Sequence, residues 1–171
     1  MLYLKPANPE DWEKEWAFVR EMPADENGLT NQWAGISREE FRQTALPRML
    51  DSARGENLPE GYVPATFFFL WNGEEIIGQY RVRHYLNDSL RDGAGHIGCF
   101  IAREHRGKGY GTQGLHLALE AAQALVSEKE FYLRVNKDNP ASLRAMLRNG
   151  GRIVREGGSA YFVRIPNPGA R

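Results

Sequence analysis

The pattern of apolar and polar positions divides the chain into short strands and amphipathic helices. Strands are expected where apolar residues alternate or cluster between turn-forming residues. They cover residues 2–5, 65–71, 75–85, 96–101, 131–135, 152–155 and 160–165. Helices are expected where apolar residues recur every three to four positions behind a capping residue. They begin after Asn8-Pro9, at the capping box Ser37-Arg38-Glu39-Glu40, at Tyr110 and after Asn139-Pro140.

Glycine and proline residues mark the breaks in this pattern. Asn72-Gly73 predicts a tight hairpin turn between two antiparallel strands. Pro47 lies inside the second helical pattern and should kink or split that helix. The polar segments 25–35 and 86–95 are interpreted as loops, and the helix that begins at Tyr110 is expected to reach Ser127.

The order of elements is β, α, α, β, β, β, α, β, α, β, β. A hairpin-connected antiparallel half leads into a β-loop-α-β crossover. We therefore predict one domain over residues 1–171 with an α/β (α+β) fold. Its mixed, mostly antiparallel central sheet should have about six or seven strands, flanked by about four helices.

Composition excludes several classes of function. Lys and Arg together number 22, as do Asp and Glu, so the net charge is zero and no nucleic-acid-binding surface is indicated. The single cysteine, Cys99, excludes an internal disulfide framework and fits a reducing compartment. No apolar run approaches the ~20 residues that span a bilayer, and residues 1–5 lack the apolar core of a signal peptide. We expect a cytoplasmic monomer or homodimer with no membrane contact and no metal site.

Candidate chemistry concentrates in Arg106-Gly107-Lys108-Gly109-Tyr110-Gly111-Thr112, between a predicted strand and a strongly periodic helix. Three glycines there leave backbone N–H groups uncovered at the positive end of a helix dipole, which favours a phosphate or pyrophosphate. A Walker-type loop is absent. The dinucleotide fingerprint G-x-G-x-x-G is matched by residues 109–114, with Asp138 near the acidic position. It lies eight positions after Ile101 rather than directly behind the strand, and few residues follow it, so an oxidoreductase is disfavoured.

The same loop resembles the signature R/Q-x-x-G-x-G/A of the GNAT (Gcn5-related) N-acetyltransferases, which follows a strand and precedes a helix. Arg106, Gly109 and Gly111 match its fixed positions, and Asn139 and Ser142 resemble the family's later N-x-x-[AS] pattern. The resemblance covers about residues 65–165. The string Arg83-His84-Tyr85-Leu86-Asn87 also resembles an uncharacterised subgroup of predicted acetyltransferases. The family resemblance implies a cofactor-binding core over residues 65–165, with acceptor-side helices over residues 1–64.

The resemblance implies acetyl-CoA as cofactor. Its site would comprise Phe100, Ile101, Arg106, Gly107, Lys108, Gly109, Tyr110, Gly111, Thr112, Asn139 and Ser142. A backbone N–H at Phe100 or Ile101 would stabilise the oxyanion, a contribution typically worth ~3 kcal/mol. Asn139 has a structural alternative as a helix cap, and Arg106 and Lys108 have one as solvated loop charges.

Candidate acid–base groups are fewer. His96, beside the implied acetyl site, is the best-placed base, with a structural histidine as the alternative. The position at which many family members carry a tyrosine acid is Met146 here, and Tyr110, Tyr132 and Tyr161 are possible substitutes. Cys99 is interpreted as a core residue rather than a nucleophile.

The acceptor site is the least defined part of the sequence. Family resemblance places its wall between Trp12 and Met49, with Asp25, Glu26 and Trp33 in the loop. Arg81 and Arg83 could bind an acidic acceptor or lie on a solvated sheet face. The leading hypothesis is direct acetyl transfer from acetyl-CoA to an amine of a small molecule or peptide. The alternative is an acyl-CoA-binding or sensing module with little or no catalysis, motivated by Met146.

Overall fold

Two antiparallel sheets form the framework of the computed structural model, which describes all residues from 1 to 171. The four-stranded sheet has the order β1-β4-β5-β6, and the three-stranded sheet has the order β7-β9-β8. The strands are β1 (Leu2–Pro6), β4 (Ala65–Asn72), β5 (Glu75–Arg83), β6 (Ile97–Ile101), β7 (Glu130–Asn136), β8 (Arg152–Glu156) and β9 (Ala160–Pro166). An isolated bridge between Gly95 and Leu133 connects β6 to β7, and beyond it the two strands diverge.

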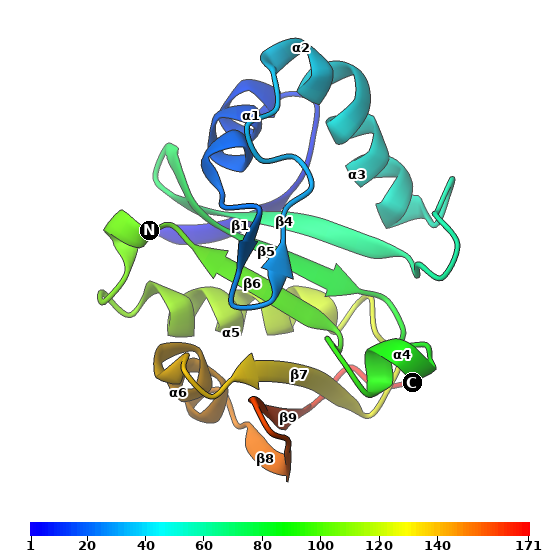
Figure 1. Cartoon of the computed structure of the whole chain (residues 1–171), viewed down its shortest axis with the longest axis vertical. Coiled ribbons are helices and arrows are strands. Elements are labelled where there is room, and N and C mark those ends of the chain that lie inside the picture. The colour runs from blue at the N-terminus through cyan, green and yellow to red at the C-terminus, as the bar shows by residue number, and fades with distance from the viewer.

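Helices cover both faces of the four-stranded sheet. In Figure 1, α1 (Trp12–Glu21), α2 (Arg38–Glu40) and α3 (Leu46–Arg54) lie on one side, while α5 (Tyr110–Ala122) lies on the other, above the three-stranded sheet. The last helix, α6 (Pro140–Arg148), packs beside α5. This arrangement confirms the predicted α/β fold class, with the difference that the strands form two sheets instead of one. No helix is both long and apolar enough to cross a membrane.

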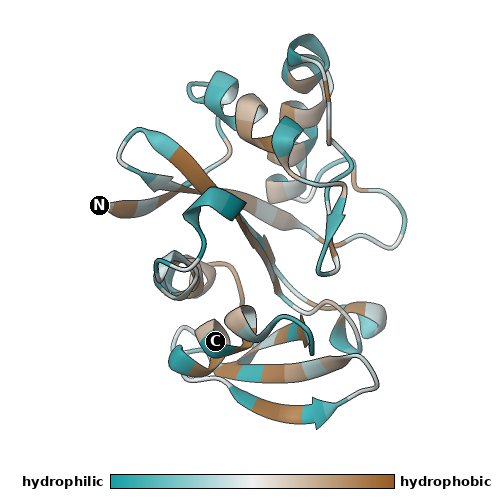
Figure 2. Ribbon diagram, turned by 60° about the vertical axis from the view of Figure 1, so that its left-hand side comes forward, coloured by the Kyte–Doolittle hydropathy of each residue, from teal (hydrophilic) through white to brown (hydrophobic).

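Two apolar clusters hold these layers together. The larger contains Leu70, Tyr80, Leu115, Leu133 and other residues of both sheets, α5 and α6. The smaller, centred on Phe41 and Phe69, lies between the four-stranded sheet and the N-terminal helices. In Figure 2 the hydrophobic colouring concentrates on the strands and inner helix faces, while turns are hydrophilic. Trp12, Trp16 and Trp33 pack against the smaller cluster, as the helical spacing of the first two indicates.

Most predicted element positions are confirmed, and the exceptions have local causes. Segment 25–35 is not wholly loop, because β2 (Asp25–Glu26) and β3 (Leu29–Thr30) form a hairpin. Segment 86–95 contains α4 (Asp88–Arg91), capped by the Asn87 side chain. Pro47 does not split its helix, since a π-helical turn at Phe41–Ala45 precedes it and the helix continues to Arg54. Helix α5 ends at Ala122 rather than at Ser127.

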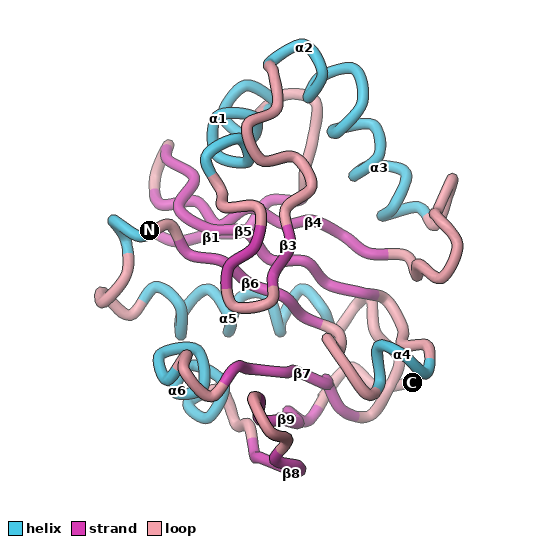
Figure 3. The backbone as a smooth tube through the Cα atoms, viewed as in Figure 1, coloured by secondary structure: helices cyan, strands magenta, loops and turns pink.

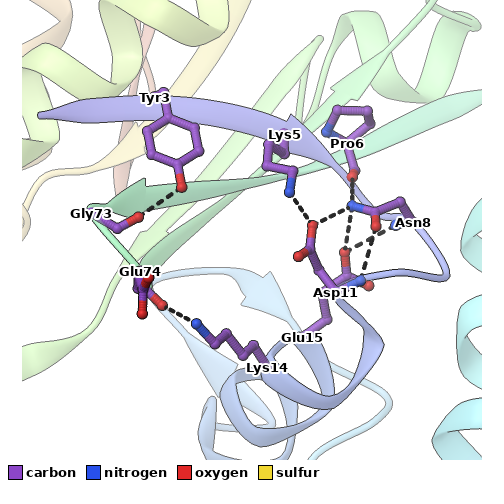
Figure 4. A network of polar contacts seen from close by, with 9 residues as sticks. All are labelled: Tyr3, Lys5, Pro6, Asn8, Asp11, Lys14, Glu15, Gly73 and Glu74. Carbon is purple, nitrogen blue, oxygen red and sulfur yellow. Dashed lines mark hydrogen bonds and ion pairs between the residues drawn. The ribbon is translucent and has the colours of Figure 1, made fainter.

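A polar network ties β1 to the start of α1 (Figure 4). Asn8 does not cap α1 itself, since its side chain accepts a hydrogen bond from the Asp11 N–H, before the helix begins. Lys5 pairs with Asp11, and the Asn8 N–H donates to Glu15 Oε1 over 2.9 Å. Glu15 is 1% exposed, and its Oε2 has no partner. Burial raises the pKa of this carboxyl to about 8, so Glu15 is mostly protonated at neutral pH.

Candidate active site

A cavity of about 450 Å³ opens where β6 and β7 diverge. One end is formed by the loop before α5 and by residues along α6. The other end is formed by β5, β7 and the β2–β3 hairpin, which crosses β5 and β6 (Figure 3). We call these the glycine-loop end and the arginine end. Strand β6 lines the passage between them, so one cavity joins two chemically different walls.

The glycine-loop end presents a row of backbone donors. Gly107 and Gly109 have φ values of 76° and 81°, in the left-handed region that favours glycine. From Gly107 to Thr112, no backbone N–H donates a hydrogen bond within the chain. The last three of these groups belong to the first turn of α5, where intrahelical acceptors are lacking. Their unpaired N–H groups and the helix dipole favour a bound anion.

The remaining glycines of the loop have separate steric roles. A Cβ at Gly111 would meet nothing within 4 Å, so this position keeps the space above the helix start open. A Cβ at Gly114 would lie 2.3 Å from the Tyr80 hydroxyl, so glycine permits α5 to approach β5 closely. The hydroxyl of Tyr80 donates to the Gly111 carbonyl over 3.4 Å. Tyr80 is the only tyrosine among the lining residues, which leaves out Tyr110, Tyr132 and Tyr161.

The backbone N–H groups of β6 that face away from β5 are not the full set that the sequence predicted. Hydrogen bonds from Arg83 N–H to His96 O and from Ala102 N–H to Ile77 O fix the alternation of the β5–β6 ladder. Phe100, opposite Gln79, falls on the hydrogen-bonded side of this ladder, so its N–H is directed to β5. This pairing therefore does not support Phe100 as the oxyanion donor. The amides of Cys99 and Ile101 point away from β5, and the outward Ile101 carbonyl accepts from Arg106 Nε.

Arg106 connects the loop to the hairpin rather than standing free. Its two terminal nitrogens donate to the Glu26 carboxylate over 2.9 and 3.1 Å, and its guanidinium lies 5.3 Å from the centre of the Phe100 ring. The hydrogen bond from Arg106 lowers the pKa of Glu26. Lys108 is exposed and has no ion-pair partner, and it is absent from the cavity lining. Arg106 thus helps to hold the hairpin over the cleft.

Residues from α6 complete the glycine-loop end. The Asn139 side chain caps α6 by accepting a hydrogen bond from the Ser142 N–H over 3.4 Å. This is the structural role that the sequence offered as an alternative to cofactor contact. Asn139, Ser142 and Met146 all line the cavity. Cys99 lies beside Ser142, and burial raises the pKa of its thiol, which keeps it protonated and supports a packing role. Met146 is 3% exposed and belongs to the larger apolar cluster.

His96 does not reach the cavity, so the geometry does not support its assignment as the base. Its side chain is fully buried, and both ring nitrogens are engaged. Nδ1 accepts from the Tyr132 N–H over 2.9 Å, and Nε2 lies 3.1 Å from Glu128 Oε1. Burial lowers the pKa of His96 despite the Glu128 carboxylate. His96 instead joins β6 to β7 at the point where the sheets meet.

Sequence reasoning missed most of the arginine end. Arg134 on β7 is not predicted there, and the lining residues Asn27 to Thr30 lie inside the predicted wall without being singled out. Glu26, Arg81 and Arg83 line the cavity as expected, whereas Asp25 and Trp33 do not. The dipeptide Asn27-Gly28 carried a signal for the hairpin, since this pair favours tight turns. No residue of α1, α2 or α3 lines the cavity, because these helices are buried against the sheet. Within the predicted acceptor wall of residues 12–49, only residues of the β2–β3 hairpin line the cavity.

The residues of the glycine-loop end fit a coenzyme A pyrophosphate. Six unpaired N–H groups lie at a helix start, no side chain fills the space above Gly111, and an apolar passage leads from there along β6. No group of His, Cys, Asp and Glu residues is arranged to hold a metal ion. The donor set and the open space of this end therefore match the pyrophosphate of a nucleotide-bearing cofactor.

Comparisons with known proteins agree with this geometry. The model of a family described as an acetyltransferase (GNAT) domain matches residues 1–152. No curated protein is significantly similar in sequence. Among solved structures, a ribosomal-protein-S5-alanine acetyltransferase from Vibrio fischeri is 16% identical with a TM-score of 0.68, over 98% of this chain and 93% of that chain.

Two further structures have the same fold with bound ligands. A spermidine N-acetyltransferase from Vibrio cholerae, in complex with CoA and spermine, is 17% identical with a TM-score of 0.62, over 97% of this chain and 95% of that chain. An N-acetyltransferase from Campylobacter jejuni, in complex with acetyl coenzyme A, is 16% identical with a TM-score of 0.58, over 97% of this chain and 99% of that chain. The family match spans most of the sequence, and the fold and the glycine loop agree with it. The chain therefore belongs to the GNAT family of acetyl-CoA-dependent N-acetyltransferases.

Proposed function

We propose that this protein transfers an acetyl group directly from acetyl-CoA to an amine of a small molecule or peptide. The observation that carries the proposal is the row of unpaired N–H groups from Gly107 to Thr112, which opens into a cavity that continues along β6. In this assignment acetyl-CoA supplies an activated acetyl thioester when bound. The pyrophosphate lies at the loop, and the acetyl end lies near β6.

The residues of the passage have defined roles in this proposal. The Ile101 N–H, or that of Cys99, donates to the carbonyl oxygen on which negative charge develops, a contribution of ~3 kcal/mol for one such donor. Asn139 and Ser142 contact the arm between the pyrophosphate and the acetyl group. Arg106 steadies the hairpin through Glu26 and closes one side of the cleft.

Proton transfers are assigned to solvent instead of a side chain. The amine must lose a proton as its nitrogen bonds to the acetyl carbon, and water in the cavity receives that proton. The carbon–sulfur bond breaks to release a thiolate. A thiol with a pKa near ~8.5 can leave without a general acid, which is compatible with methionine at position 146 and with the engagement of the Tyr80 hydroxyl by Gly111.

A second candidate is an acyl-CoA-binding module without turnover. It is favoured by one observation, the buried methionine at the position of the usual acid. Both candidates predict binding of acetyl-CoA, so binding alone does not separate them.

Thermal unfolding with acetyl-CoA, followed by a thiol-release assay over a panel of amines, tests the two candidates in sequence. The proposal predicts saturable stabilisation by acetyl-CoA and release of free thiol above background with at least one amine. Stabilisation without release over the panel would favour the binding module. Absence of stabilisation at millimolar acetyl-CoA would contradict both.

A further inference from the structure

The arginine end of the cavity carries positive charge without matching carboxylates. Arg81 and Arg83 project from β5, and Arg134 projects from β7. None of the three has a carboxylate within 4.0 Å in the described ion pairs, which involve other residues. Glu26 is the only acidic residue in the lining, and its carboxylate is already paired with Arg106 and approached by Arg103. The net charge of this end is therefore positive.

Burial makes this positive charge unfavourable in the free protein. Arg81 Nε is buried and has no hydrogen-bond partner. Burial lowers the pKa of Arg81, and burial together with the Arg81 charge lowers the pKa of Arg83 to about 10. Both groups remain charged at neutral pH. Because charges withdrawn from water are normally paired, two neighbouring, partly buried guanidinium groups without an anion indicate a missing counter-ion.

The two guanidinium groups are also held in place. Arg81 donates from one terminal nitrogen to the Thr30 carbonyl over 3.2 Å, and its guanidinium lies 5.0 Å from the centre of the Phe67 ring. Arg83 donates from one terminal nitrogen to the Gly95 carbonyl over 3.1 Å. Each guanidinium group donates one hydrogen bond to a backbone carbonyl, and its other N–H groups have no acceptor within the protein. Preoriented guanidinium donors suit carboxylate and phosphate oxygens.

This charge distribution disfavours a polycationic acceptor. One structural neighbour, the Vibrio cholerae enzyme, was solved with spermine, which is polycationic. In the present chain a polyamine would meet Arg81, Arg83 and Arg134 with no free carboxylate. Like charges at close range in a partly desolvated cleft repel each other.

We propose that the acceptor is an amine that also carries a carboxylate or a phosphate, bound through that anion by Arg81 and Arg83, with Arg134 contributing from β7. The amine part of this inference rests on the proposed acetyl transfer. In that proposal, the amine of the bound acceptor points along β6 toward the acetyl group. The anion-binding part stands on the arginine geometry alone. The two parts are tested separately.

The first experiment measures anion binding without turnover. With CoA saturating, so that the glycine loop is occupied, thermal unfolding is followed while inorganic phosphate or acetate is titrated at constant ionic strength. The proposal predicts saturable stabilisation of the wild type by at least one anion, reduced at least tenfold in apparent affinity in Arg83→Gln and in Arg81→Gln. Arg42→Gln, which removes an exposed arginine outside the cavity, is the matched control and should behave like the wild type. Absence of saturable anion binding in the wild type would overturn the proposal, whether or not the variants fold.

The second experiment measures acceptor preference by thiol release. Matched pairs of amines are compared: amino acids with their methyl esters, amino sugar phosphates with the free amino sugars, and spermidine as a cationic acceptor. The acid-bearing member of at least one class should have a kcat/KM at least tenfold higher than its neutral partner, and the class identifies the anion. Arg83→Gln should reduce this preference and raise the acceptor KM while leaving the KM for acetyl-CoA unchanged. Equal or better use of neutral amines or spermidine would refute the inference. Anion binding without any acetyl transfer would instead refute the proposed function and leave the anion site in place.

Discussion

The two ends of the cavity differ in how they present positive potential. At the glycine-loop end the donors are backbone N–H groups of six consecutive positions, Gly107 to Thr112, set by two left-handed glycines and a helix start. At the arginine end the donors are side chains from β5 and β7, covered by a hairpin from the first 30 residues. In the proposed function, backbone groups of consecutive residues bind acetyl-CoA, whereas side chains from distant segments bind the acceptor. On this proposal, the first end sets the reaction class and the second end sets the substrate.

The largest expected effect separates packing from binding within α5. Replacing Gly114 with leucine would drive a side chain into Tyr80 and Leu70, because even a Cβ would lie 2.3 Å from the Tyr80 hydroxyl. We expect a loss of about 3 kcal/mol in unfolding free energy, at the upper end of overpacking costs. Gly111→Ala, whose Cβ meets nothing within 4 Å, is the control and should unfold like the wild type in urea. Equal stability of the two variants would show that α5 does not pack on β5 as described.

The next prediction concerns Glu15 on α1, outside both ends of the cavity, and the dependence of folding stability on pH. The pKa of Glu15 is about 8 in the folded state and 4.5 in the reference state, so between these values the folded chain binds more protons than the unfolded chain. Stability should therefore fall as pH rises from about 5 to 8, by roughly 3 kcal/mol in total, since each pH unit between the two pKa values contributes up to about 1.4 kcal/mol. Glu15→Gln should flatten this slope in denaturant titrations at several pH values. A slope that persists in the variant would assign it to other groups.

A smaller effect is expected where the two ends are connected. Glu26→Gln weakens the bidentate pair with Arg106 that holds the hairpin to the loop. The pair is partly exposed, so stability should change by no more than about 1 kcal/mol. The acceptor KM should rise several-fold, because the hairpin covers the arginine end, while acetyl-CoA affinity stays within about twofold, because backbone groups supply that site. A selective loss of acetyl-CoA binding would show that the ends are not independent.

The smallest effect is expected at Met146. If the thiolate leaves without a general acid, the methionine acts only as a packed wall, and Met146→Leu conserves its volume closely. The kcat should stay within about twofold of the wild type in the thiol-release assay. A tenfold loss would assign Met146 a direct role in the reaction.

The glycine-loop end could be predicted from sequence because its geometry is local. Glycines at 107 and 109, the helix start at Tyr110 and the capping residue Asn139 each carry their conformational preference in a few neighbouring residues. The direction of the Phe100 N–H depends on the pairing of β5 with β6, and the burial of His96 depends on Tyr132 and Glu128, more than thirty positions away. The arginine end likewise depends on contacts between β5, β7 and the hairpin. These long-range contacts leave no short signature, apart from the unused turn signal Asn27-Gly28.

The central claim is that acetyl-CoA binds at the start of α5, and calorimetric titration of two matched tryptophan variants tests it most directly. Gly111 and Gly158 both offer a Cβ no contact within 4 Å, so tryptophan should be accommodated at either site, but only Gly111 lines the cavity. We predict saturable acetyl-CoA binding by the wild type and by Gly158→Trp, and a loss of at least tenfold in affinity in Gly111→Trp. Unchanged affinity in a folded Gly111→Trp, or no binding by the wild type at millimolar acetyl-CoA, would contradict the account.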